Sequence, residues 1–179
     1  MTPKEKDNFE INAYSKQVLD SKRWIDTSIE LLDSVKVLEP IVRNRWLNFI
    51  NLQGDVRSLM IHKTFFFLIG LSLENLLKSR IVKYHNKNLR LELKKTGKLP
   101  NILKGNHELF KYANEAKIEL TLEQENLLKR LSRAIKWSGR YAFLQSYKSW
   151  SFDDYTIDDI DKMKDLYNDI YQLVIREKK

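Results

Sequence analysis

The sequence predicts an all-α protein, an antiparallel bundle of four to six helices that forms a single domain over residues 1–179. Only five glycines and three prolines occur in the chain, too few for the many turns of a β-rich fold. Apolar residues recur at steps of three and four in four segments, the spacing of helices with one buried face. A chain of this length can bury roughly two-thirds of its unfolded surface, so a hydrophobic core can hold it together.

The N-terminal third is expected to form two helices. The apolar spacing predicts a first helix from about Tyr14 to Leu38, and Pro40 should interrupt it because proline disfavours helical backbone before it. A second, shorter helix is predicted over Ile41–Ile50, and Gly54 follows as a stop signal.

The third helix is predicted to be the longest and most apolar. Asp55 is a suitable N-cap, and the helix should run to about Tyr84. Its longest uncharged run, Thr64–Leu73, is about half the roughly 20 residues that a membrane helix needs. We therefore expect a buried core helix and no membrane association.

A strongly basic segment follows, His85–Gly105, and its Gly and Pro content predicts a flexible or partly helical connection. Its charge fits either a solvated loop or an arm that contacts phosphates. In the second case Lys94, Lys95 and Lys98 are the candidate nucleic-acid-binding residues.

Three more helices are predicted in the C-terminal half. Asn106 can cap a short helix, and Thr121 with Gln124 forms a capping box that opens a helix to Trp137. A final amphipathic helix should begin at Thr156.

Composition narrows the classes of function. The chain contains no cysteine, which excludes thiolate metal sites and thiol nucleophiles, and its three histidines lack metal-ligand spacing. No P-loop, Rossmann fingerprint or GxSxG motif occurs, so no cofactor or metal is expected. The N-terminal residues are charged and lack the apolar segment of a signal peptide, which favours a cytoplasmic location. The net charge of +8 suits a polyanionic partner such as RNA, or simple solubility.

Three short motifs carry polar residues in unusual places. Glu74 and Lys78 are four residues apart within the most apolar helix, where a buried charge needs a partner. His107 lies at the start of a short helix, and Arg140 with Tyr141 follows a helix end. We expect Glu74, Lys78, His107 and Arg140 to meet on one side of the bundle. Such a cluster could serve either as a structural lock or as a functional site.

These motifs resemble the HEPN superfamily, over about Phe65–Phe143. Many HEPN domains show A-x-E-K-x-L-K, then T-H-D-L opening the next helix, then R-Y-P. The counterparts in this chain are ENLLK, NHEL and GRY, which begin at Glu74, Asn106 and Gly139. The chain departs from the family pattern at three positions, where Asn75, Glu108 and Ala142 replace lysine, aspartate and proline.

The resemblance implies a function and partners. HEPN domains include metal-independent endoribonucleases and catalytically silent RNA binders, some of them in phage defence or toxin–antitoxin systems. It also implies a homodimer, since HEPN sites usually form across a dimer interface, and a protein antitoxin as a further partner.

The resemblance also implies an arginine followed, four to six residues later, by a histidine. Arg80 with His85 fits this spacing and is the candidate catalytic pair; Arg57 with His62 fits it too. In such a pair, histidine would act as general base or acid and arginine would stabilise charge on the phosphate. Residues five apart on one straight helix point about 140° apart, so a partner chain or a helix end is needed to bring them together.

Two alternatives to this reading stay open. One is a non-enzymatic helical module that dimerises or docks on a protein, and the other is a basic nucleic-acid-binding accessory protein unrelated to HEPN. An aromatic-rich stretch between the last two predicted helices, residues 137–155, could stack bases or pack on the bundle.

Overall fold

The computed structural model describes residues 3–50, 60–138 and 155–176, and the described chain is an all-α helical bundle with no strand. Its α-helices are α1 (Pro3–Val18), α2 (Ser21–Ile50), α3 (Met60–Thr96), α4 (Leu109–Glu115), α5 (Leu122–Arg133) and α6 (Asp158–Arg176). Two short elements complete it, the 3-10 turn η2 (Asn101–Leu103) and the π-helical segment η3 (Ala134–Ser138).

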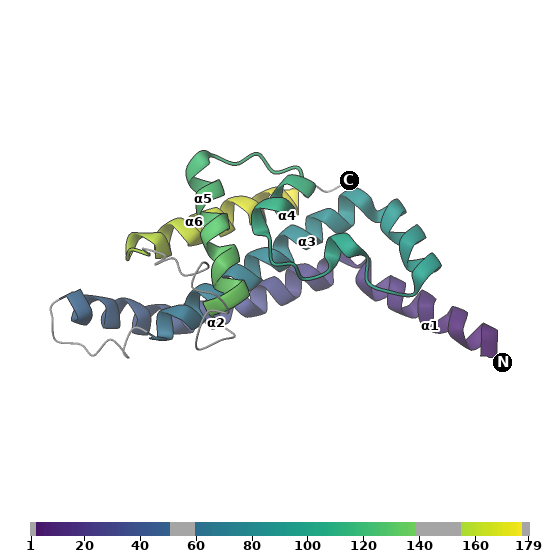
Figure 1. Ribbon diagram of the computed structural model, residues 1–179, viewed down its shortest axis with the longest axis horizontal. Helices are drawn as coiled ribbons and strands as arrows, with labels where there is room; N and C mark the ends of the chain where they lie inside the picture. The colour runs from purple at the N-terminus through teal and green to yellow at the C-terminus, as the bar shows by residue number, and fades with distance from the viewer. Residues whose placement is uncertain (1–2, 51–59, 139–154, 177–179) are drawn as a thin grey trace.

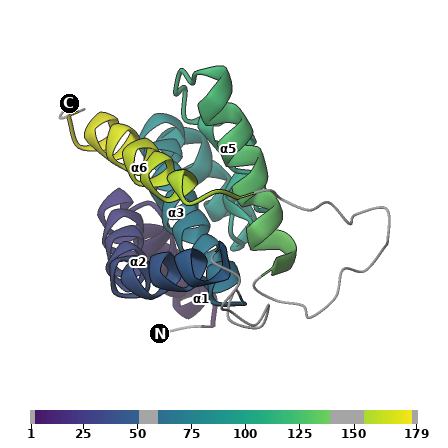
Figure 2. The ribbon, with the colours of Figure 1, turned by 90° about the vertical axis from the view of Figure 1, so that its left-hand side faces the viewer.

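Helix α3 forms the centre of the molecule. It packs against α1, α2, α4, α5, η3 and α6. Helices α2 and α3 lie side by side along the long axis (Figure 1), and in the end view α2, α5 and α6 surround α3 (Figure 2). The α3 side chains that face these neighbours are fully buried, among them Phe65, Ile69, Leu73, Leu76, Leu77 and Ile81. Within the described part of the chain, no helix is long and apolar enough to cross a membrane.

The predicted first helix is in fact two. Helix α1 ends at Val18 and α2 begins at Ser21, within the segment predicted as one helix. Asp20 lies between the two helices and caps the start of α2, because its carboxylate accepts a hydrogen bond of 3.0 Å from the Lys22 backbone N–H. The Trp24 indole N–H donates to the Val18 carbonyl at 2.9 Å, which satisfies one of the groups exposed at the end of α1.

The predicted break at Pro40 was wrong, because α2 continues through it to Ile50. A proline inside a helix costs about 3 kcal/mol, so tertiary contacts must offset this cost. Glu39 supplies one such contact beside Pro40, since its carboxylate binds Lys164 of α6 at 3.0 Å. Within α2 the same carboxylate binds Arg43 at 2.9 Å. Arg43 also binds Asp161 of α6 at 2.5 Å, so ion pairs join α6 to this part of α2.

The predicted end of the third helix near Tyr84 was also wrong. Helix α3 continues to Thr96 because Leu89 and Leu93 are buried, so the basic segment has one apolar face. Gly97 ends the helix in the left-handed conformation, with φ of +62°, and its N–H donates to the Leu93 carbonyl at 2.8 Å.

The capping box on α5 was predicted correctly. Thr121 Oγ1 accepts from the Gln124 N–H at 3.2 Å, and Gln124 Oε1 accepts from the Thr121 N–H at 3.0 Å. Helix α4 is short and closes with a two-bond turn. The N–H of Lys117 donates to Asn114 O and that of Ile118 to Ala113 O, with Lys117 itself at φ of +52°.

Candidate functional site

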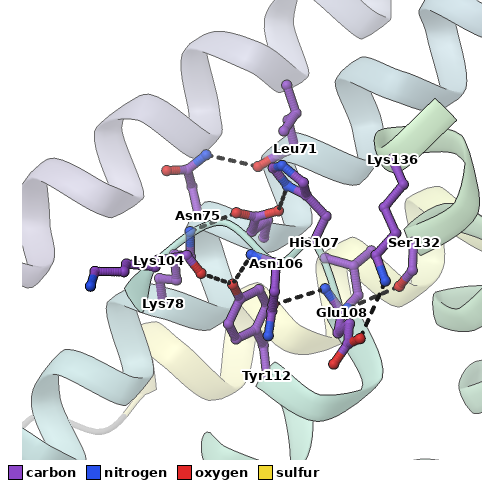
Figure 3. Close-up of polar contacts among 12 residues, drawn as sticks. Leu71, Asn75, Lys78, Lys104, Asn106, His107, Glu108, Tyr112, Ser132 and Lys136 are labelled. Carbon is purple, nitrogen blue, oxygen red and sulfur yellow. Dashed lines mark hydrogen bonds and ion pairs between the residues drawn. The ribbon is translucent and has the colours of Figure 1, made fainter. Parts of the chain in front are cut away.

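A buried polar cluster joins α3 to the segment before α4. Glu74 Oε1 accepts a hydrogen bond of 2.6 Å from Lys78 Nζ, and Glu74 Oε2 lies 2.8 Å from His107 Nδ1. The side chains of Glu74, Lys78 and His107 are only 5%, 7% and 14% exposed. Figure 3 shows Lys78 and His107 turned toward the same carboxylate. Both oxygens of that carboxylate are therefore engaged.

Aromatic rings complete the surroundings of Lys78. Its ammonium lies 5.6 Å from the centre of the Trp24 ring and 5.2 Å from the centre of the Tyr112 ring. Both distances fall within the range of cation–π attraction, which strengthens as the cation loses water. The buried charge is thus stabilised by one carboxylate and two rings.

The segment that carries His107 is held in an uncommon conformation. His107 has φ of +57°, in the left-handed region that side chains other than glycine rarely adopt. Tyr112 ties down the preceding residues, since its hydroxyl donates to the Lys104 carbonyl at 2.6 Å and accepts from the Asn106 N–H at 3.3 Å. The Leu109 N–H donates to Ser132 Oγ of α5 at 2.9 Å, which fixes the start of α4.

Tyr112 itself is electrostatically perturbed by the cluster. Burial raises the pKa of its phenol to about 12, and the negative charge of Glu74 acts in the same direction. Both effects disfavour the phenolate. Tyr112 therefore remains a hydrogen-bond donor throughout the neutral range.

The structure brings together three of the four residues expected to converge, and the fourth, Arg140, lies outside the described residues, as does Tyr141. Asn75, which stands where the HEPN pattern has lysine, is turned toward its own helix and donates to the Leu71 carbonyl at 2.8 Å. Sequence reasoning missed Trp24 and Tyr112 as members of the cluster, because neither carries a motif.

The candidate catalytic pair lies on one uninterrupted helix. The sequence placed His85 at a helix end, but it lies eleven residues before the last residue of α3. Its Nε2 lies 3.2 Å from the Glu115 carbonyl, whereas Arg80 is buried and contacts Tyr84, with Nη2 3.3 Å from the hydroxyl. The two side chains thus contact different groups. Of the other pair, His62 packs edge-on to Trp46 and Phe66, and Arg57 lies outside the described residues.

The predicted lysine arm is mostly helical. Lys94 and Lys95 form the last turn of α3, Lys98 follows Gly97, and all three are exposed. Seven lysine and arginine residues but a single glutamate occur from Lys83 to Lys104, so this segment accounts for six of the eight excess positive charges.

Four of these residues form one row, which we call the basic stripe: Lys83, Lys87, Arg90 and Lys94. Their spacings of four, three and four place them on one face of α3, over about 16 Å. All four are exposed, and the last three form no ion pair with any residue that the structure describes. Lys83 donates to the Val174 carbonyl at 2.6 Å. The sequence already contains this spacing, and only the misplaced helix end concealed it.

No group of histidine and carboxylate side chains in the described ranges is arranged to hold a metal ion. No family model, curated protein or solved structure matches the chain.

The polar cluster is suited to holding helices together. A carboxylate that is 5% exposed and engaged at both oxygens offers little access to a substrate. The basic stripe is the opposite case, since its cations are exposed and can exchange water for phosphate. The geometry therefore separates a structural cluster from a surface that can bind a polyanion.

Proposed function

We propose that this protein is a HEPN-like RNA-binding protein that contacts the phosphate backbone through the basic stripe. The observation that carries the proposal is the row of Lys83, Lys87, Arg90 and Lys94 on one exposed face of the longest helix. A rigid helix that presents cations in a row can contact successive phosphates and release the counterions bound to them.

The distribution of charge supports binding over simple solubility. Many basic residues elsewhere are paired with carboxylates, as in Lys22 with Asp26, Lys36 with Asp33 and Lys162 with Glu123. The stripe lacks such partners among the described residues, and Glu92 is the single acidic residue in its segment. An unneutralised row of one sign produces a local positive potential that attracts polyanions.

The choice of RNA rests on the HEPN resemblance of the three motifs. The same resemblance motivates a homodimer and a protein antitoxin as a partner. The absence of cysteine fits the cytoplasmic setting that we also propose. We propose binding as the primary activity rather than cleavage, because Arg80 is packed on Tyr84 and His85 contacts a backbone carbonyl.

A salt series tests the proposal. Binding of a single-stranded RNA is measured for the wild type, for a stripe variant with Lys87, Arg90 and Lys94 changed to Gln, and for a matched control with Lys22, Lys36 and Lys162 changed to Gln. For the wild type we expect the logarithm of the association constant to fall steeply with the logarithm of the salt concentration. In the stripe variant the magnitude of this slope should be smaller by roughly 2. A second variant with Lys94, Lys95 and Lys98 changed to Gln tests the exposed lysines at the end of α3.

The control variant removes the same number of charges from α2 and α6, so it should leave the slope nearly unchanged. Equal slopes for the wild type and the stripe variant would refute the stripe as the binding surface. Equal losses in the stripe and control variants would show that net charge alone attracts the RNA.

A further inference from the structure

A second group of basic side chains lines a cavity between α4, α5 and η3. The cavity has a volume of about 260 Å³, just below the range of about 300–1,000 Å³ for small-ligand sites. It is lined by the basic side chains Lys111, Lys129, Arg133 and Lys136, by one carboxylate, Glu108, and by Phe110 and Ser132. Cations thus outnumber anions four to one.

The cavity combines two kinds of contact. Phe110 supplies an aromatic surface, and the Lys129 ammonium lies 4.5 Å from the centre of its ring. Lys111 is exposed and forms no ion pair with any described residue. A planar aromatic group that bears a negatively charged substituent matches this pairing of ring and cations.

Two ion pairs at the cavity are partly exposed. Lys129 lies 3.3 Å from Glu125, and Lys136 lies 3.3 Å from Glu108. The Lys136–Glu108 pair is partly exposed, and Figure 3 shows these two side chains facing each other beside Ser132. Exposed pairs of this kind contribute little to stability, so a phosphate can displace Glu108 from Lys136.

The backbone at this cavity is also unusual. Ala134–Ser138 is π-helical and carries Lys136, and π-helical turns occur frequently at functional sites. Ser132 precedes it, and its hydroxyl donates to the Leu128 carbonyl at 2.7 Å while accepting from the Leu109 N–H. This hydroxyl joins α5 to the start of α4 and so fixes the two walls of the cavity.

We propose that this cavity binds a nucleoside monophosphate unit, either a free nucleotide or the phosphorylated end of an RNA. The base packs against the Phe110 ring and the Lys129 ammonium that lies over it, and the phosphate binds Lys111 and Lys136 in place of Glu108. The site is separate from the basic stripe and does not depend on the stripe for its charge or its walls.

Calorimetric titration with adenosine 5′-monophosphate tests the site, with adenosine, inorganic phosphate and a short 5′-phosphorylated oligoribonucleotide as comparison ligands. We expect the monophosphate to bind more tightly than adenosine or phosphate alone. Changing Lys111 and Lys136 to Gln should weaken binding at least tenfold, since each loses a charged contact. Changing Lys36 and Lys162 to Gln removes the same charge elsewhere and should have little effect.

Glu108→Gln provides a test of opposite sign. The Glu108 side chain makes no capping hydrogen bond to α4, so its replacement should leave the fold intact. Removing its negative charge should tighten nucleotide binding. Unchanged binding would show that the phosphate does not replace Glu108 at Lys136.

The comparison ligands and the stripe variant separate the possible results. Tighter binding of the oligoribonucleotide than of the free nucleotide identifies an RNA end as the ligand, and the reverse identifies a free nucleotide. Unchanged nucleotide binding by the stripe variant shows that the two surfaces act separately. The proposal fails if neither nucleotide ligand binds, if phosphate alone binds as tightly as the monophosphate, or if the Lys111 and Lys136 changes have no effect.

Discussion

His107 Nδ1 lies 2.8 Å from Glu74 Oε2, although the two residues are separated by 33 positions in the chain. Because a carboxylate can only accept, the ring N–H is the donor in this bond. The contact ties the strained backbone at His107 to the most buried helix of the protein. Through Glu74, His107 is also linked to Lys78, so the three side chains form one continuous set of polar contacts.

We expect Glu74→Gln to destabilise the protein by about 3 kcal/mol, because it leaves the Lys78 ammonium buried without its carboxylate. Urea denaturation measures the free energy of unfolding. Glu125→Gln breaks the exposed pair with Lys129 and serves as the control, with an expected change below about 1 kcal/mol. Adding Lys78→Met to Glu74→Gln should recover part of the loss. Equal effects of Glu74→Gln and Glu125→Gln would contradict the structural role of the cluster.

Lys117→Gly should stabilise the protein by about 1 kcal/mol. Lys117 has φ of +52° at the end of α4, a conformation that costs a residue with a Cβ roughly 1–2 kcal/mol and glycine almost nothing. Lys111→Gly is the matched control, because it removes the same side chain from the interior of the same helix and should destabilise by about 1 kcal/mol. Thermal denaturation distinguishes the two signs. A loss of stability on Lys117→Gly would argue against the left-handed turn.

The Tyr112 phenol should titrate late. Burial and the Glu74 charge raise its pKa to about 12, above the value near 10 expected in the unfolded chain. The neutral phenol therefore contributes stability that is fully present below pH 10 and is lost as the pH rises toward 12. The difference in unfolding free energy between the wild type and Tyr112→Phe should shrink over that interval. A difference that is constant from pH 9 to 12 would mean that the phenol is not perturbed.

RNA incubated with the protein in EDTA is expected to remain intact, because Arg80 contacts Tyr84 of its own helix whereas His85 contacts the Glu115 carbonyl of α4. Gel electrophoresis of a labelled RNA provides the measurement. If cleavage is seen and disappears in His85→Gln but persists in His62→Gln, the pair is catalytic and a second chain must bring its members together. Cleavage that survives both substitutions would indicate a contaminating nuclease.

Local signals predicted some helix boundaries well and others poorly. The Thr121 cap was predictable because both of its hydrogen bonds lie within four residues. Pro40 and the charges of residues 85–96 misled because contacts from elsewhere in the fold decide these positions. Helix α6 is ion-paired to α2 around Pro40, and the buried Leu89 and Leu93 continue α3 to its stop at Gly97.

The candidate site shows the same division. Glu74 and Lys78 could be chosen from sequence because two charges within an apolar helix require partners. Trp24 and Tyr112 could not, since an aromatic residue at helical spacing is indistinguishable from any other core residue. The cavity at Phe110 arises where α4 packs against α5, and the sequence of these neighbouring elements does not show how their side chains leave this space.

Helix α3 contacts each of the other α-helices that the structure describes: α1, α2, α4, α5 and α6. Its central amide groups can therefore meet water only when several neighbours separate at once. Hydrogen exchange in the middle of α3 should then report the opening of the whole molecule, while the exposed turn that carries Lys94 and Lys95 exchanges through local fraying. An RNA held on the basic stripe would slow exchange in that last turn and leave the centre of α3 governed by the global unfolding reaction.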